Sequence, residues 1–245
     1  MYPSSLDHWY PINGASLSLQ GLSTPLSSAL PLSMHVSPGS KGGVTGFYND
    51  GYWGMDVKIQ KYTGSFWVKG SYTGKFTAGL RSALTNETFG SVEIQSKSNS
   101  HSWTEHTFTL TPTTAASNSN NTFAITFDAT GSTDVSLDFN LISLFPPTYN
   151  NRPNGNRIDL MEAMAALSPK FFRLPGGNNM EGNTNKTFWM WNNTIGPLKD
   201  RPGFDGTWGY EQTAGLGLVE YLLWAQDLGA EPSKSRYLNG QWIHS

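Results

Sequence analysis

Short apolar or alternating runs, separated by turns rich in glycine, asparagine and proline, recur along residues 1–148. Their length and spacing are those of β-strands in an all-β domain, because a helix needs a longer run with a period of 3.6 residues. The expected strands are 15–19, 34–36, 54–59, 64–68, 75–80, 91–95, 104–110, 122–127 and 135–145. About nine strands at this spacing predict a β-sandwich of the jelly-roll type.

One of these strands carries a tryptophan on the face opposite its apolar residues. In the run 64–68, Phe66 and Val68 share one face and Trp67 lies on the other. Trp67 therefore points away from the core unless a neighbouring domain covers it. Two interpretations stay open: Trp67 is a stacking surface for sugar, or it packs at a domain interface.

A different pattern begins after a proline-rich segment without periodicity at residues 145–155. We place a domain boundary between residues 148 and 149. A helical spacing at 158–167 is followed by a short apolar run at 171–174 and a glycine turn. This order is half of a β/α unit and implies a parallel sheet.

The rest of this second domain consists of a long loop, a helix and the start of a strand. The loop at 178–209 has no clear periodicity, and a loop of about 30 residues in a compact domain is usually functional. A helix is expected at 213–228, and Glu231 begins the next strand. Residues 233–245 are polar and without pattern.

The stretch 170–182, KFFRLPGGNNMEG, is the strongest candidate for a functional site. Asn178 and Glu181 follow the glycine turn at the carboxyl end of a strand, where α/β folds build their sites. Arg173 lies inside the apolar run, and a buried guanidinium is costly unless it is paired. We therefore expect Arg173 to meet a carboxylate or to hold a ligand at the strand end. A plain turn with a structural ion pair explains the stretch equally well.

Composition excludes several classes of function. Charged residues make up 14% of the chain and the net charge is −2, without the basic patch of a nucleic-acid binder. No apolar run approaches the roughly 18 residues of a membrane span, and the amino terminus lacks the features of a signal peptide. There is no cysteine, and the five histidines lack metal-ligand spacing, so we expect neither disulfides nor a metal site.

Aromatic residues and potential glycosylation sites favour a secreted protein that handles carbohydrate. Aromatic residues make up 13% of the chain and include nine tryptophans, which stack on sugar rings when they are not in the core. Four Asn-x-Thr triplets predict N-glycosylation. Their asparagines are Asn86, Asn120, Asn185 and Asn192.

Several longer motifs resemble one family. The segments RLPGGNNMEG, WMWNNTIGPLKDRPG and TWGY followed by GLGLVEYLLWAQDLGAEP are similar to fungal α-L-arabinofuranosidases of glycoside hydrolase family 51. The segments WYPINGASLSLQ, NDGYWGMDVK, YTGSFWVKG and LDFNLISLFPPTYNNRPNG are similar to the carbohydrate-binding-like sandwich inserted in that family. The resemblance covers residues 7–232.

The resemblance implies a β-sandwich (residues 1–148) followed by the start of a (β/α)8 TIM barrel (residues 149–232). It implies an extracellular glycosidase that removes terminal α-L-arabinofuranosyl groups from arabinan and arabinoxylan with retention. Two glutamates with carboxyl groups about 5–5.5 Å apart perform such a reaction. The implied partner is an arabinose-containing plant polysaccharide, and no metal or organic cofactor is implied.

The family's motifs carry over to three substrate-binding residues. Arg173 and Asn178 occupy the positions that line the arabinose subsite, and Trp208 matches an aromatic residue placed near the sugar. Leu174 stands where the family more often has phenylalanine.

The chain also departs from the family's pattern. The family's first barrel strand is absent before the sandwich, and both catalytic glutamates lie beyond the strand that begins at Glu231, so no catalytic residue is assigned. Five other carboxylates lie within the barrel segment and match neither catalytic motif, and we expect them to be solvated or structurally paired. They are Asp159, Glu162, Glu181, Glu211 and Glu220. We further expect an incomplete gene product that is inactive alone; a non-catalytic carbohydrate-binding module and an inert truncation product are the alternatives.

Overall fold

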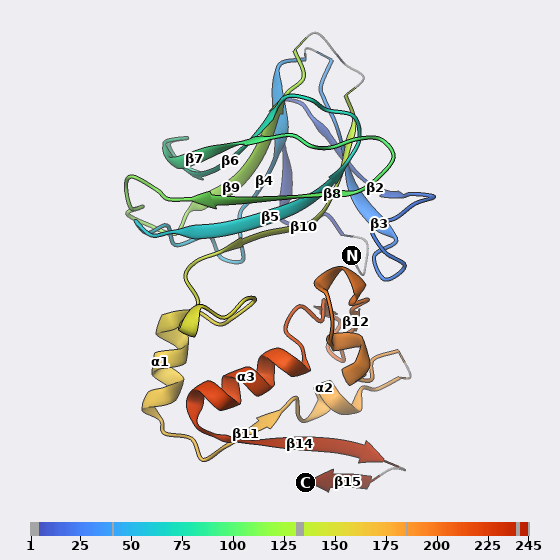
Figure 1. Ribbon diagram of the computed structural model, residues 1–245, viewed down its shortest axis with the longest axis vertical. Helices are drawn as coiled ribbons and strands as arrows, with labels where there is room; N and C mark the ends of the chain where they lie inside the picture. The colour runs from blue at the N-terminus through green and yellow to red at the C-terminus, as the bar shows by residue number, and fades with distance from the viewer. Residues whose placement is uncertain (1–4, 41, 131–134, 185, 239–240, 245) are drawn as a thin grey trace. The chain divides into compact units, whose positions relative to one another are not determined.

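The computed structural model describes residues 5–40, 42–130, 135–184, 186–238 and 241–244 (Figure 1). Side chains are described as far as Ser233. The chain forms two compact units. The sandwich unit comprises Ser4–Leu26 and Pro31–Pro146, and the β/α unit comprises Ser27–Leu30 and Pro147–Ser245. Each unit is described separately.

Within the described residues, the sandwich unit contains two five-stranded sheets in which all pairs are antiparallel. The first sheet has the order β1 (Trp9–Ile12), β4 (Val44–Asn49), β9 (Asn121–Asp128), β6 (Lys75–Ser82) and β7 (Thr88–Gln95). The second has the order β2 (Ser16–Gly21), β3 (Leu32–Ser37), β10 (Leu137–Phe145), β5 (Tyr62–Lys69) and β8 (Thr104–Leu110). The predicted β-sandwich is confirmed.

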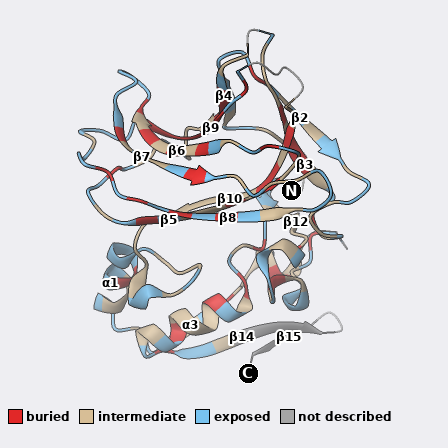
Figure 2. Ribbon diagram, turned by 45° about the horizontal axis from the view of Figure 1, so that its top comes forward, coloured by how far each residue is buried: buried red, intermediate tan, exposed pale blue. Residues whose placement is uncertain are grey.

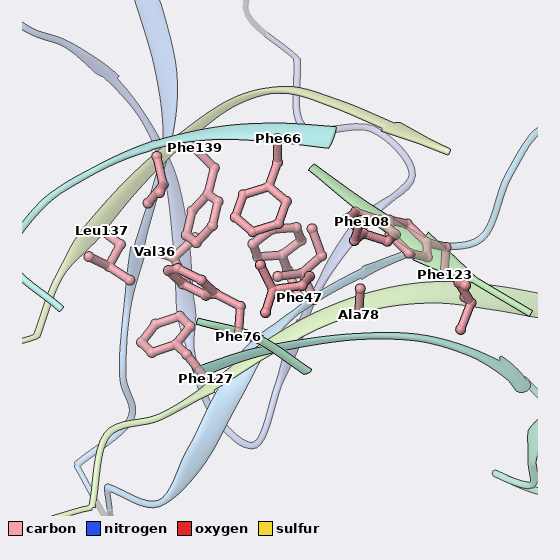
Figure 3. Close-up of a cluster of buried hydrophobic side chains, with 14 of the residues drawn as sticks. Val36, Phe47, Phe66, Phe76, Ala78, Phe108, Phe123, Phe127, Leu137 and Phe139 are labelled. Atoms are coloured by element: carbon pink, nitrogen blue, oxygen red, sulfur yellow. The ribbon is translucent and has the colours of Figure 1, made fainter. Parts of the chain in front are cut away.

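Alternation along the strands builds the core between the two sheets. Buried positions alternate with more exposed ones along β6 and β8 (Figure 2), as the period of two of a half-buried strand requires. Phe66 of β5 and Phe76 of β6 are fully buried, and their rings meet edge to face with centroids 5.2 Å apart (Figure 3). Both also contact Phe139 of β10, so one aromatic cluster joins the two sheets.

Two details of the strand prediction differ from the structure, and one agrees with it. Residues 54–59 form no strand, because Gly54 takes a φ of +90° and the segment bonds instead to a neighbouring loop, where Met55 N donates to Ser119 O over 2.7 Å. Strands β1 and β4 were not expected from the sequence. Trp67 is half-buried on the face of β5 opposite Phe66, as the alternation predicts.

The β/α unit is built around a parallel strand pair. Helix α1 (Ile158–Ala166) leads to β11 (Phe171–Leu174), and α3 (Leu218–Leu228) leads to β14 (Glu231–Leu238). Strand β14 lies parallel to β11, with Phe171 opposite Glu231, and β15 (Gln241–His244) pairs antiparallel to β14. The predicted helix, strand, glycine turn and parallel sheet are confirmed.

Shorter elements lie between β11 and α3. They are α2 (Asn178–Glu181), β12 (Phe204–Asp205), β13 (Glu211–Gln212) and 3-10 helices at Trp191–Thr194 and Leu198–Asp200; a further 3-10 helix, Tyr149–Asn151, precedes α1. Helix α3 begins five residues later than expected, because Ala214 has a φ of +55° and Gly217 is extended. None of the described helices has the length and hydropathy of a membrane span.

Strand β11 is less buried than its apolar sequence predicts. Leu174 is buried, whereas Arg173 is exposed and Phe171 is 67% exposed. Helix α3 covers only the face of β11 that carries Phe172, whose ring lies 6.4 Å from that of Tyr221. The expectation of a buried Arg173 is therefore wrong for the part of the chain that the structure describes.

Candidate functional site

Arg173 folds back over the glycine turn that ends β11. Gly176 has a φ of +148°, and a Cβ built on it would lie 3.1 Å from Arg173 Cζ and 3.2 Å from Nη2. A glycine at this position therefore lets the guanidinium lie against the turn. Among the side chains that the structure describes, no carboxylate pairs with Arg173. The expected structural ion pair is not seen there, and the ligand-holding alternative stays a prediction.

Asn178 opens helix α2 directly after the turn. Its side chain is exposed, and its carbonyl oxygen accepts hydrogen bonds from Gly182 N at 2.9 Å and from Thr207 Oγ1 at 3.0 Å. Asn183 Nδ2 donates to Thr207 O over 3.4 Å. Two hydrogen bonds therefore fasten the chain at Thr207 to the segment that begins with Asn178.

Trp208 follows Thr207 at the tip of a short hairpin. Strands β12 and β13 pair antiparallel, and Gly206 N donates to Tyr210 O over 2.8 Å to close the turn. A side chain on Gly206 would collide with Tyr210 O, so this turn requires glycine. Trp208 is 62% exposed. The structure thus links the segments of Arg173, Asn178 and Trp208, which are separated by up to 35 residues, at one glycine turn.

A buried ion pair holds the long loop that carries this hairpin. Arg201 Nη2 lies 2.9 Å from Glu220 Oε1 and Nη1 lies 3.2 Å from Oε2, with side chains 5% and 10% exposed. Arg201 also donates to the carbonyl oxygens of Gly196 and Ala214. Glu220 accepts from Gly217 N at 3.0 Å. The pair therefore ties three points of the loop to the first turn of α3.

The pKa of Glu220 reflects this pairing. Burial alone would raise the pKa of its carboxyl, but hydrogen bonds from Arg201 and Asn154 and the charge of Arg201 hold it below the ordinary value. Glu220 is therefore structurally paired, as expected. The partner Arg201 lies 19 residues away, and nothing in the local pattern identifies it.

A second ion pair joins the segment before α1 to the end of α3. Arg152 Nη2 lies 2.8 Å from Asp227 Oδ1, and Asn150 Nδ2 donates to the same oxygen over 2.9 Å. The hydrogen bond from Arg152, followed by that from Asn150, holds the pKa of Asp227 below its ordinary value despite partial desolvation.

The other carboxylates considered from the sequence have varied surroundings. Asp159 pairs with Arg157 on the surface, and Glu162 is exposed on α1. Glu181 is half-buried at the end of α2. Partial desolvation, with the charge of Asp205 across the hairpin, raises the pKa of Glu211. Among the described residues, no group of three or more His, Asp or Glu has a metal-binding arrangement.

Three of the four predicted glycosylation sites are exposed. Asn86 lies in the turn between β6 and β7, Asn120 precedes β9, and Asn192 lies in a 3-10 helix. Asn185 lies outside the described residues. Glycosylation at these positions stays a prediction.

Comparisons with known proteins agree on one family. Residues 163–236 match the sequence model of the α-L-arabinofuranosidase 1 domain, which extends four residues beyond Pro232. The chain is 40% identical over 230 residues to the probable α-L-arabinofuranosidase A of Aspergillus terreus, covering 93% of this chain and 36% of that protein. It is 39% identical over 230 residues to α-L-arabinofuranosidase A of Aspergillus kawachii, with the same coverage.

A solved structure is similar over nearly the whole chain. The crystal structure of an arabinose-bound α-L-arabinofuranosidase of glycoside hydrolase family 51 matches with a TM-score of 0.87 and 39% identity, covering 96% of this chain and 39% of that one. The chain spans about a third of the length of the curated relatives it matches, 36% in each of the two named above. In both sequence and fold, the chain is similar to α-L-arabinofuranosidases, among them an enzyme of glycoside hydrolase family 51.

Proposed function

We propose that the β/α unit supplies part of the arabinose-binding subsite of a retaining α-L-arabinofuranosidase. The enzyme would remove terminal α-L-arabinofuranosyl groups from arabinan and arabinoxylan. The observation that carries the proposal is the similarity, over 96% of this chain, to a family 51 enzyme solved with arabinose bound. An extracellular location is part of the same proposal, and the exposure of Asn86, Asn120 and Asn192 supports it.

The chemistry of the three proposed binding residues suits a furanose. The Arg173 guanidinium offers planar donors to hydroxyl oxygens, and it has no carboxylate partner among the described side chains that would compete for them. The Asn178 amide both donates and accepts, which matches hydroxyl groups that do the same. The exposed indole of Trp208 offers an apolar face to the carbon side of the ring.

The proposed role is binding rather than bond cleavage. Retention requires a nucleophile and an acid/base with carboxyl groups about 5–5.5 Å apart. Glu220 and Asp227 are both held by arginines, and each has a lowered pKa, so neither is suited to donate a proton. No described carboxylate is assigned to the chemical step.

Saturation-transfer NMR with methyl α-L-arabinofuranoside tests the proposal on the chain itself. We expect signal transfer to the sugar that is lost in Asn178→Ala and in Arg173→Ala. Asn192→Ala, an exposed asparagine in the same unit, is the matched control and should leave the transfer unchanged. Unchanged transfer in both site variants, or none in the parent chain, contradicts the proposal.

A further inference from the structure

The turn after β4 displays two aromatic side chains that the fold does not use. Tyr52 is 83% exposed and Trp53 is 85% exposed. Their ring centroids lie 5.9 Å apart and their planes are perpendicular, at 89°. Because the rings touch only edge to face, most of their surface stays open to solvent.

The turn itself is firmly held in the sandwich unit. Gly51 N donates to Asn49 Oδ1 over 2.8 Å, and Met55 N donates to Ser119 O over 2.7 Å. A side chain on Gly54 would collide with Ser119 O, so the two segments lie in close contact. Asn121, which is buried, donates to Met55 O over 2.8 Å. The aromatic pair is therefore presented on a pre-organised support, which lowers the entropic cost of binding a ligand.

Neither backbone preference nor packing explains a tryptophan at position 53. Trp53 has a φ of +64°, a conformation that is unfavourable for a bulky side chain and that asparagine or glycine adopts more easily. Its indole is almost wholly exposed, so its burial adds little to the stability of the core. The fold of the sandwich unit alone therefore gives no reason for a tryptophan at this position.

Hydrogen-bonding groups lie immediately beside the pair. Asp50 precedes Tyr52 by two residues, and its Oδ1 lies 2.9 Å from His8 Nδ1, with both side chains partly exposed. Tyr10 stacks on Tyr48 across β1 and β4, with centroids 5.1 Å apart. Open aromatic faces next to carboxylate, imidazole and phenol groups match the apolar face and the hydroxyl edge of a sugar ring.

We propose that Tyr52 and Trp53, with Asp50 and His8, form a carbohydrate-binding platform on the sandwich unit. Its ligand is a sugar unit within a neutral polysaccharide, whose ring stacks on one of the two aromatic faces. The platform consists of residues other than Arg173, Asn178 and Trp208 and binds without cleaving. The choice of arabinoxylan as its polymer rests on the proposed function, but the site does not.

Affinity electrophoresis of the full chain in native gels with and without soluble arabinoxylan tests the platform. We expect the polymer to retard the parent chain and the dissociation constant to rise at least about tenfold in Trp53→Asn and in Tyr52→Ala. Trp53→Asn is the sharper variant, because asparagine suits the backbone at that position and should leave the melting temperature unchanged or higher. Leu84→Ala, an exposed apolar residue in the β6–β7 turn, is the matched control and should bind like the parent.

Three results would overturn the platform. The first is a parent chain that arabinoxylan does not retard, and the second is normal retardation of a folded Trp53→Asn variant. The third is retardation that Asn178→Ala abolishes and Trp53→Asn does not, which would assign the binding to the β/α unit. Conversely, if the parent chain shows no NMR signal transfer to the arabinoside but is still retarded by arabinoxylan, the proposed arabinose subsite is refuted and the platform is not.

Discussion

Removal of the Glu220 carboxylate should markedly lower the melting temperature of the β/α unit. In Glu220→Ala, Arg201 would keep its charge at a position where its side chain is 5% exposed. The four hydrogen bonds that Glu220 accepts, two from Arg201 and one each from Asn154 and Gly217, would be lost together. The substitution therefore leaves a buried cation without a carboxylate partner and removes a hydrogen bond at the first turn of α3.

The magnitude follows from what is left behind. Breaking a buried ion pair by removing one partner costs about 3–5 kcal/mol, because the remaining charge is desolvated and unpaired. The double variant Arg201→Met with Glu220→Leu removes both charges. It lacks the hydrogen bonds to Gly196 and Ala214, but it contains no unpaired buried charge. We expect that double variant to cost about 1–3 kcal/mol, less than Glu220→Ala alone.

Calorimetric unfolding of the full chain measures the effect, and the sandwich unit acts as an internal reference. Glu220→Ala should lower the transition of the β/α unit and leave that of the sandwich unit in place. Glu162→Ala, an exposed glutamate on α1, is the control and should change the free energy of unfolding by less than about 0.5 kcal/mol. A Glu220→Ala variant as stable as this control, or a double variant less stable than Glu220→Ala, would refute the reasoning.

Two further predictions concern a buried histidine and the link between Asn178 and the hairpin. Burial lowers the pKa of His106, so its neutral form is favoured in the folded state. The free energy of unfolding of the sandwich unit should therefore fall as the pH drops below about 6.5, the ordinary pKa of histidine. Denaturant titrations at several pH values should show a shallower fall in His106→Gln than in the parent chain. Thr207→Val removes the donor to Asn178 O and should lower the free energy of unfolding of the β/α unit by about 0.5–1.5 kcal/mol, and Thr207→Ser should restore it. Equal pH profiles of the parent and His106→Gln would contradict the first prediction, and equal stability of Thr207→Val and the parent would contradict the second.

The strands that the sequence did not reveal contain the residues that usually argue against a strand. Pro11 lies in β1, which is an edge strand of its sheet, where one side of the backbone needs no ladder partner. Gly46 lies in β4 with a φ of +152°, and a side chain there would collide with Ile125 O of β9. Apolar alternation predicts which faces are buried, as for Phe66 and Trp67, but it does not detect strands whose pattern is interrupted by proline or glycine.

The candidate site shows a different limit of sequence reasoning. The apolar residues of β11 predict that this strand pairs in a sheet, and it does pair with β14. They do not indicate whether one or both faces of the strand are covered. The hydrogen bond from Thr207 to Asn178 and the ion pair of Arg201 with Glu220 join residues 29 and 19 positions apart. No local periodicity encodes such contacts, because each depends on where a long loop returns.

Motif resemblance and physical geometry nevertheless reach Arg173 by independent routes. The motif assigns Arg173 and Asn178 to sugar binding. Independently of the motif, a guanidinium within an apolar strand needs a physical explanation. In the structure the Arg173 guanidinium is exposed and lies against Gly176, where a side chain at position 176 would crowd the guanidinium. An arginine near the carboxyl end of a parallel strand, with no carboxylate partner among the described side chains, can donate hydrogen bonds to a ligand bound at that strand end. The hydrogen bond at Thr207 then fastens the chain next to Trp208 to the same turn, which is why we propose a single subsite rather than three separate contacts.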